Sequence, residues 1–113
     1  MGNEIICKAL DALHGSIDNS SLNDNEKNAL DLLVDKLKVY FNGEINEIAN
    51  MGNQAQAERR KNVLYSFMTD YLVAINDTIA GMNDTFSVVN RIYKEINYDY
   101  KKGKFKIKRL NKQ

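Results

Sequence analysis

The sequence predicts an all-α protein: a helical bundle, or an antiparallel coiled-coil-like arrangement, of three to four helices with a short basic C-terminal tail or hairpin. One observation behind this fold class is that the chain contains no proline and only six glycines, so little interrupts long helices. Another is that apolar residues recur every three or four positions in three separate segments. With 113 residues, 43% hydrophobic and 27% charged, the chain has the size and composition of one soluble globular domain. We expect the helical domain over residues 1–100 and a basic tail over residues 101–113.

The first helix is expected over residues 4–14. Its apolar stripe consists of Ile6, Leu10 and Leu13. Gly15 follows as a typical C-terminal stop signal. The next ten residues are rich in Ser, Asn and Asp, whose side chains bond to nearby backbone groups, so they predict a loop.

The second helix is expected over residues 24–50. Asn23 and Glu26 have the spacing of a capping box, in which each side chain bonds to the backbone N–H of the other residue. One apolar stripe then follows at spacings of four and three: Leu30, Val34, Leu37, Phe41, Ile45 and Ile48, widened by Leu33 and Tyr40. A cluster of Asn50, Gly52 and Asn53 breaks the pattern and predicts a turn.

Residues 57–98 carry a heptad repeat. The a positions are Tyr65, Leu72, Ile79, Phe86, Tyr93 and Tyr100, and the d positions are Met68, Ile75, Met82, Val89 and Ile96, so that all are apolar or aromatic. Asparagine follows d four times in succession, at Asn76, Asn83, Asn90 and Asn97. A period of 3.5 sustained over this length is typical of a helix that supercoils with a partner helix.

The unbroken heptad favours one continuous helix over residues 57–98. Such a helix would be about 60 Å long, well beyond the diameter of a compact domain of this size, so its far half would need another subunit. We therefore predict a homodimer or higher homo-oligomer along the heptad seam from Tyr65 to Ile96. The alternative is a break near residues 81–83, which would give a compact four-helix bundle whose seam closes within one chain.

The C-terminal segment is strongly basic. Residues 1–100 hold nine basic and fifteen acidic residues, a net charge of −6, whereas the last thirteen residues hold seven basic residues and no acid. The basic residues are Lys101, Lys102, Lys104, Lys106, Lys108, Arg109 and Lys112. They are candidates for nucleic-acid contact, and the alternative is a solvated tail that aids solubility. Lysine alternates with Phe105 and Ile107, so the segment either pairs as a hairpin with residues 96–100 or remains a frayed tail.

No residue set for catalysis is recognisable. Cys7 and His14 lie about two helical turns apart, too far for a nucleophile and its base, and a single His and a single Cys give no zinc pattern. Asp70, Asp77 and Asp84 are spaced by seven, which indicates a solvated stripe. The glycines are scattered singly, without a phosphate-binding loop. We expect no enzymatic activity, no cofactor and no metal.

The function class that remains is a non-enzymatic protein that binds another protein, as an inhibitor, immunity protein or accessory factor. A small nucleic-acid-binding accessory protein that uses the basic tail is the alternative. The layout is similar to that of bacteriocin immunity proteins of lactic acid bacteria in architecture and length, and it carries no family motif. No segment has the roughly 18 apolar residues of a membrane span, the single cysteine favours the cytoplasm, and the Asn-, Lys- and Ile-rich composition favours a low-GC bacterium or its phage or plasmid.

Overall fold

The computed structural model describes residues 2–102, with the side chains of residues 3–97. Four helices make up this part of the chain: α1 (Gly2–Asp18), α2 (Asp24–Ala49), α3 (Gln54–Ile79) and α4 (Thr85–Lys102). The predicted all-α fold class is confirmed, with four packed helices in one bundle.

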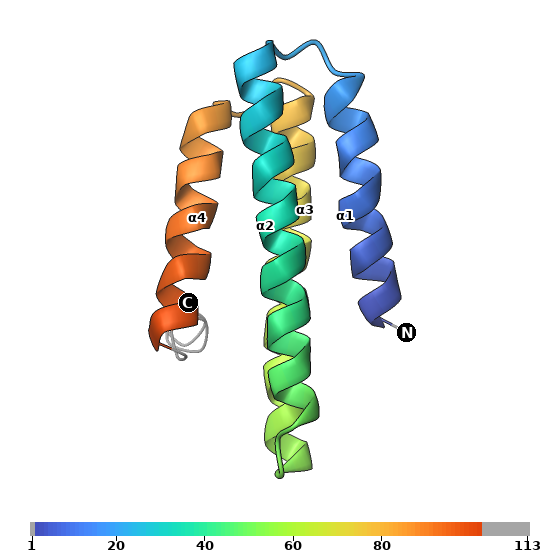
Figure 1. Ribbon diagram of the computed structural model, residues 1–113, viewed down its shortest axis with the longest axis vertical. Coiled ribbons are helices and arrows are strands. Elements are labelled where there is room, and N and C mark those ends of the chain that lie inside the picture. Colours follow the sequence, from blue (N-terminus) through green and yellow to red (C-terminus); the bar gives the residue numbers. More distant parts are fainter. Residues whose placement is uncertain (1, 103–113) are drawn as a thin grey trace.

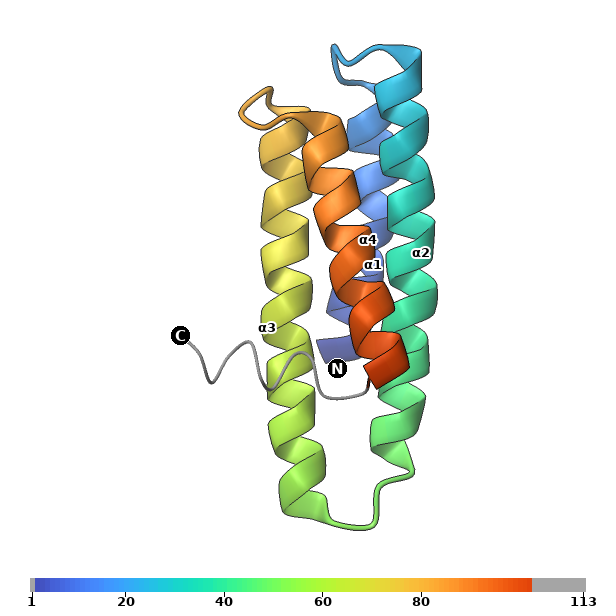
Figure 2. The same ribbon diagram turned by 90° about the vertical axis from the view of Figure 1, so that its left-hand side faces the viewer.

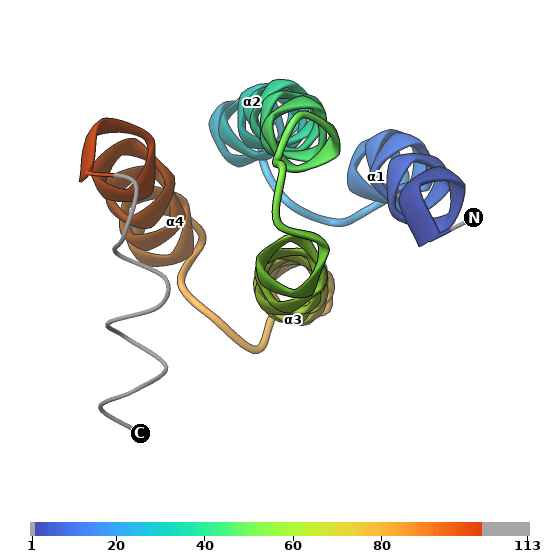
Figure 3. The same cartoon turned by 90° about the horizontal axis from the view of Figure 1, so that it is seen from below.

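The two long helices, α2 and α3, form a central hairpin, and the shorter helices α1 and α4 lie on either side of it (Figure 1). Seen from below, α1 and α4 each pack against both central helices (Figure 3), and within residues 2–102 they make no contact with each other. The chain direction alternates from helix to helix, so α2 and α4 run the same way. The fold therefore leaves one face of α2 beside a parallel neighbour, α4.

The α2–α3 hairpin extends beyond the ends of α1 and α4 (Figure 2). The principal extents are 46 × 29 × 21 Å and the radius of gyration is 14.5 Å, above the roughly 13 Å expected of a compact domain of this length. The bundle is therefore elongated, with the turn between α2 and α3 at its free end.

The core combines most of the predicted apolar stripe residues with others outside those stripes, such as Ile17, Leu64 and Ile92. Its buried members are Ile6, Leu10, Leu13 and Ile17 of α1; Leu30, Leu33, Val34, Leu37, Tyr40, Phe41 and Ile48 of α2; Leu64, Phe67, Met68, Tyr71, Ala74 and Ile75 of α3; and Val88, Val89, Ile92 and Ile96 of α4. Because side chains three and four residues apart share a helix face, each helix presents one continuous apolar stripe to its neighbours.

Side-chain caps define the helix starts. The capping box predicted at α2 is present: the Glu26 backbone N–H donates to Asn23 Oδ1 at 2.9 Å, and the Asn23 N–H donates to Glu26 Oε1 at 3.2 Å. The second Glu26 oxygen, Oε2, accepts from Thr85 Oγ1 at the start of α4. Asn53 caps α3, which begins three residues before the predicted position.

The expected end of the first helix at residue 14 is wrong, because α1 continues through Gly15 to Asp18. The extra turn brings Ile17 into the core, where its side chain is fully buried. Burial of a whole isoleucine outweighs the roughly 1 kcal/mol that a helical glycine costs relative to alanine.

The continuous helix over residues 57–98 is also wrong, because the chain turns between α3 and α4. The Gly81 N–H donates to the Thr78 carbonyl and the Met82 N–H to the Asp77 carbonyl, the paired bonds of a Schellman motif, and Gly81 has a φ of +83°. Asp84 then caps α4, since its Oδ2 accepts from the Ser87 N–H at 3.0 Å. The alternative of a break near residues 81–83 is the one observed.

The heptad seam lies mostly inside the chain. Four d positions are buried, namely Met68, Ile75, Val89 and Ile96, whereas Met82 in the turn is 72% exposed. At the a positions, Tyr65, Leu72, Ile79 and Tyr93 are half-buried and Phe86 is exposed. The apolar seam on which the homo-oligomer prediction depended is therefore filled by the chain's own helices, so the seam no longer argues for self-association.

Helix α3 also does not pack against a single helix. The Tyr65 hydroxyl donates to Asn3 of α1, and its ring lies 6.1 Å from the Phe41 ring of α2, whereas the Tyr71 hydroxyl donates to Glu95 of α4 at 3.0 Å. The periodicity of α3 thus reflects packing against three neighbours.

The alternative in which residues 96–100 form one strand of a hairpin is wrong, since these residues belong to α4, as do Lys101 and Lys102. The other proposed nucleic-acid contacts, Lys104, Lys106, Lys108, Arg109 and Lys112, lie outside the described residues.

Candidate functional site

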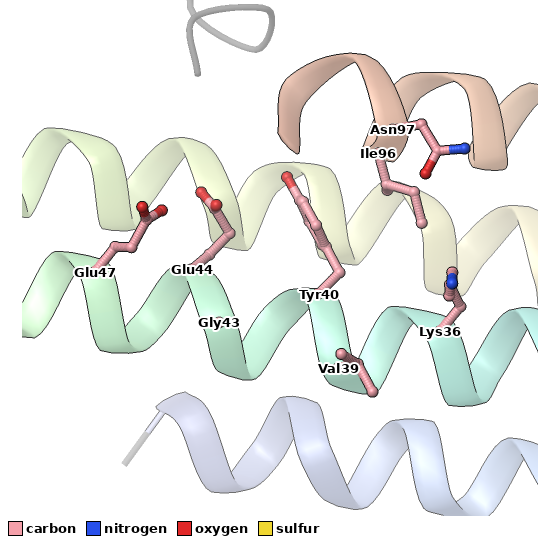
Figure 4. Close-up of a pocket in the computed structure, with 8 residues that line it drawn as sticks. All are labelled: Lys36, Val39, Tyr40, Gly43, Glu44, Glu47, Ile96 and Asn97. Atoms are coloured by element: carbon pink, nitrogen blue, oxygen red, sulfur yellow. The ribbon is translucent and has the colours of Figure 1, made fainter. Parts of the chain in front are cut away.

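A groove of about 490 Å³ lies between α2 and the C-terminal part of α4 (Figure 4). Its lining, which we call the α2–α4 groove, consists of Lys36, Val39, Tyr40, Gly43, Glu44 and Glu47 of α2 and Ile96 and Asn97 of α4. In Figure 4, the Ile96 side chain extends from α4 towards α2. The groove therefore lies along the boundary between two parallel helices.

A missing side chain helps to keep the groove open. Gly43 lies in the middle of α2, and no atom outside its local helix lies within 4 Å of the position that its Cβ would occupy. Val39, one turn earlier, is 71% exposed although it is a branched apolar residue. The groove thus has an apolar wall beside an unfilled space.

Exposed apolar side chains continue this surface along both helices. On α2, Leu32 precedes Lys36, Val39 and Gly43 at spacings of four, three and four, so all share one face. Leu32 is 63% exposed.

On α4, the corresponding stripe is Phe86, Asn90, Tyr93 and Asn97, again at spacings of four, three and four. Phe86 is 46% exposed. Burial raises the pKa of Tyr93, and the negative charge of Asp35 on α2 raises it further, which indicates that Tyr93 lies near α2. Leu32 and Phe86 thus extend the apolar surface towards the N-terminal ends of both helices.

The lower end of the groove is acidic. Arg60 of α3 lies between two carboxylates of α2, with its Nη2 3.2 Å from Glu44 Oε1 and 3.0 Å from Glu47 Oε2. Glu44 is buried, whereas the Glu47 side chain is 63% exposed. These three groups sum to a net charge of −1, and Lys36 carries a positive charge at the other end of the groove. The groove is therefore polarised along its length.

The sequence-predicted site residues contribute little to this groove. Of the heptad seam, Ile96 lines the groove; the rest of the described lining comes from α2 and from Asn97 of α4. One signal could have identified the surface: Leu32 and Val39, spaced by seven, are apolar but lie off the main stripe of α2.

Outside the groove, Cys7 and His14 have separate partners. Cys7 Sγ lies 3.9 Å from Asn42 Oδ1. The His14 ring lies between Asp31 and Asp35. Within the described part of the chain, no three His, Cys, Asp or Glu side chains are grouped so that they could hold a metal ion, and no helix there is long and apolar enough to span a membrane. No family model, curated protein or solved structure matches this chain.

Proposed function

We propose that this protein acts by binding another protein, without catalysing a reaction, and that the α2–α4 groove receives the partner. The observation that carries the proposal is that exposed apolar side chains occur at and beside the groove. Six large apolar side chains are exposed among the described residues. Of these, Val39 lines the groove, and by helical spacing Leu32 and Phe86 share faces with the lining residues Lys36 and Asn97. Exposed apolar groups gathered at a concave place are typical of protein docking surfaces.

The charges of the groove specify the kind of segment it would accept. An apolar side chain of the partner would enter the space beside Gly43 and contact Val39 and Ile96. A basic group of the partner would lie towards Glu44 and Glu47, and an acidic group towards Lys36. We accordingly place the protein among inhibitors, immunity proteins or accessory factors of a low-GC bacterium, phage or plasmid.

Affinity capture from a lysate of the source cells tests this proposal with two groove variants and two matched controls. Val39→Asp places a charge on the apolar wall, and Gly43→Leu fills the open space. Val73→Asp and Gly15→Leu make the same changes on α3 and α1, where Val73 is also exposed and Gly15 also has open space around it. Circular dichroism checks that all four variants keep their helices.

We expect one protein to be retained by the unmodified chain and by both controls, and to bind each groove variant at least about tenfold more weakly, equivalent to about 1.4 kcal/mol. Titration of the purified partner gives the values. The proposal would be contradicted if the captured protein bound both groove variants as tightly as the unmodified chain. It would also be contradicted if the chain turned over a defined substrate and bound no protein partner.

A second candidate, nucleic-acid binding through the basic residues from Lys101 to Lys112, is supported by the charge separation along the chain. Binding of this kind would tolerate sequence changes in the nucleic acid and weaken steeply with salt. Electrophoretic mobility shifts at about 50 mM salt, with the full chain and a chain truncated after Tyr100, test it. The absence of any shift of DNA or RNA by the full chain would eliminate this candidate.

A further inference from the structure

α4 brings the C-terminal part of the chain to the acidic end of the groove. Ile96 and Asn97 line the groove, and the five further residues to Lys102 advance α4 by about 7.5 Å. This advance is in the direction in which α2 runs from Tyr40 towards Glu47, because the two helices are parallel (Figure 1). The C-terminal end of α4 therefore points towards the acidic end of the groove, and residues 103–113 follow it in the sequence.

The remaining segment is long enough to follow the groove. The lining residues of α2, from Lys36 to Glu47, span about 16 Å along the helix axis. Eleven residues reach about 36 Å when extended. Residues 103–113 can thus fold back over the whole groove after a single turn, for which Gly103 is suited.

The side chains of this segment complement the groove. Phe105 and Ile107 alternate with lysines, so in an extended segment they share one face and the lysines the other. The apolar face matches the wall formed by Val39 and Ile96. Five basic residues and no acid give residues 103–113 a net charge of +5, against −6 for residues 1–100.

We infer that residues 103–113 occupy the α2–α4 groove of their own chain and compete there with the protein partner. This inference rests on the function proposed above and adds a built-in regulator to the same site. In this arrangement Lys104 and Lys106, the first basic residues after the turn, lie towards Glu44 and Glu47, where the groove has a net negative charge.

Disulfide trapping in the full chain tests the inference. In a Cys7→Ser background, Val39→Cys is combined with Ile107→Cys, and the matched control combines Ser66→Cys with Ile107→Cys. Val39 lies ten residues before the end of α2 and Ser66 twelve residues after the start of α3, so the two exposed positions are at similar heights on the two helices that contact α4. Mass spectrometry follows intramolecular cross-linking, and non-reducing gels separate it from dimers.

We expect the 39–107 pair to cross-link at least about tenfold faster than the 66–107 pair. Adding Phe105→Ser to the 39–107 pair should slow cross-linking severalfold, whereas Asn111→Ser should leave it unchanged. Equal rates for the two pairs, indifference to Phe105→Ser, or cross-linking only between two chains would each overturn the inference. If cross-linking fails while Val39→Asp still weakens partner binding, residues 103–113 do not occupy the groove and the proposed function stands. If Val39→Asp has no effect on partner binding, the proposed function is wrong.

Discussion

His14 joins α1 to α2 through both nitrogens of its ring. Nδ1 lies 2.8 Å from Asp31 Oδ1 and Nε2 lies 3.0 Å from Asp35 Oδ1. An ionised carboxylate accepts hydrogen bonds but cannot donate them, so both contacts are hydrogen bonds only when both ring nitrogens carry a proton. The hydrogen bond to Asp31 is the largest cause that raises the pKa of His14, with further contributions from Asp35, while partial burial opposes the shift.

This arrangement predicts that stability decreases as the pH rises from 6 to 8. The pKa of His14 is higher in the folded chain than its usual 6.5 in the unfolded chain, so its contribution is complete below about 6.5 and is lost as the pH rises through the folded-state value. Since the side chain is one-third exposed, we expect a loss of about 1 kcal/mol or less. Urea unfolding at several pH values measures it, and His14→Gln should remove most of the dependence. An equally steep profile in that variant would contradict the assignment.

Two helical glycines predict stabilising substitutions. Gly15 and Gly43 lie inside helices with open space at the Cβ position, so alanine would add helix propensity without a clash. We expect Gly15→Ala and Gly43→Ala each to raise the free energy of unfolding by about 0.5–1 kcal/mol. Urea denaturation measures the change, and a loss of stability at either position would show that the space is not open in solution.

At the scale of the elements, the turn between α3 and α4 determines the fold. Gly81→Ala should destabilise the protein by about 1–2 kcal/mol, because its φ of +83° is unfavourable for any residue with a Cβ. Thermal unfolding should show a lower melting temperature for Gly81→Ala and a higher one for Gly15→Ala, although the chemical change is the same. A neutral Gly81→Ala would mean that the Schellman turn does not form.

The sequence predicted elements better than the connection between two of them. The stripes of α1 and α2 and the capping box at Asn23 are local signals, and each is found in the structure. The heptad pattern favoured a continuous helix instead of the break at residues 80–84. The reason is that the d positions on both sides, Ile75 and Val89, are two heptads apart and are both buried in the core. Periodicity reports which side chains are buried, and it carries no information on which helix covers them.

The groove could not be predicted from these local signals. It depends on how far α4 lies from α2, which is a consequence of tertiary packing. Leu32 and Val39 are exposed on one face of α2, but only the position of α4 places Val39 in a concave surface.

At the scale of the whole molecule, burial of the seam predicts a monomer. Ile75 is fully buried and Met82 is 72% exposed, although both occupy d positions. We expect Ile75→Lys to destabilise the chain by several kcal/mol, since an unpaired charge would enter the core, and Met82→Lys to change stability by less than about 0.5 kcal/mol.

Sedimentation equilibrium measures the oligomeric state directly. The unmodified chain and Met82→Lys should both sediment near 12.9 kDa at micromolar concentration. A dimer that Met82→Lys dissociates would instead restore the seam as an interface between subunits.

Glu26 uses its two carboxylate oxygens for two helices, Oε1 at the start of α2 and Oε2 at Thr85 at the start of α4. The upper ends of these helices are thereby fastened at one point, and α4 has no contact with α1 in residues 2–102 to restrain it from the far side. The two parallel helices are thus joined through Glu26 at their N-terminal ends and border the groove towards their C-terminal ends. A partner side chain wedged beside Gly43 would press on α4 far from Glu26, where the hydrogen bond from Tyr71 to Glu95 and the buried Ile96 hold α4 to the core, so any displacement of α4 would be largest at its C-terminal end.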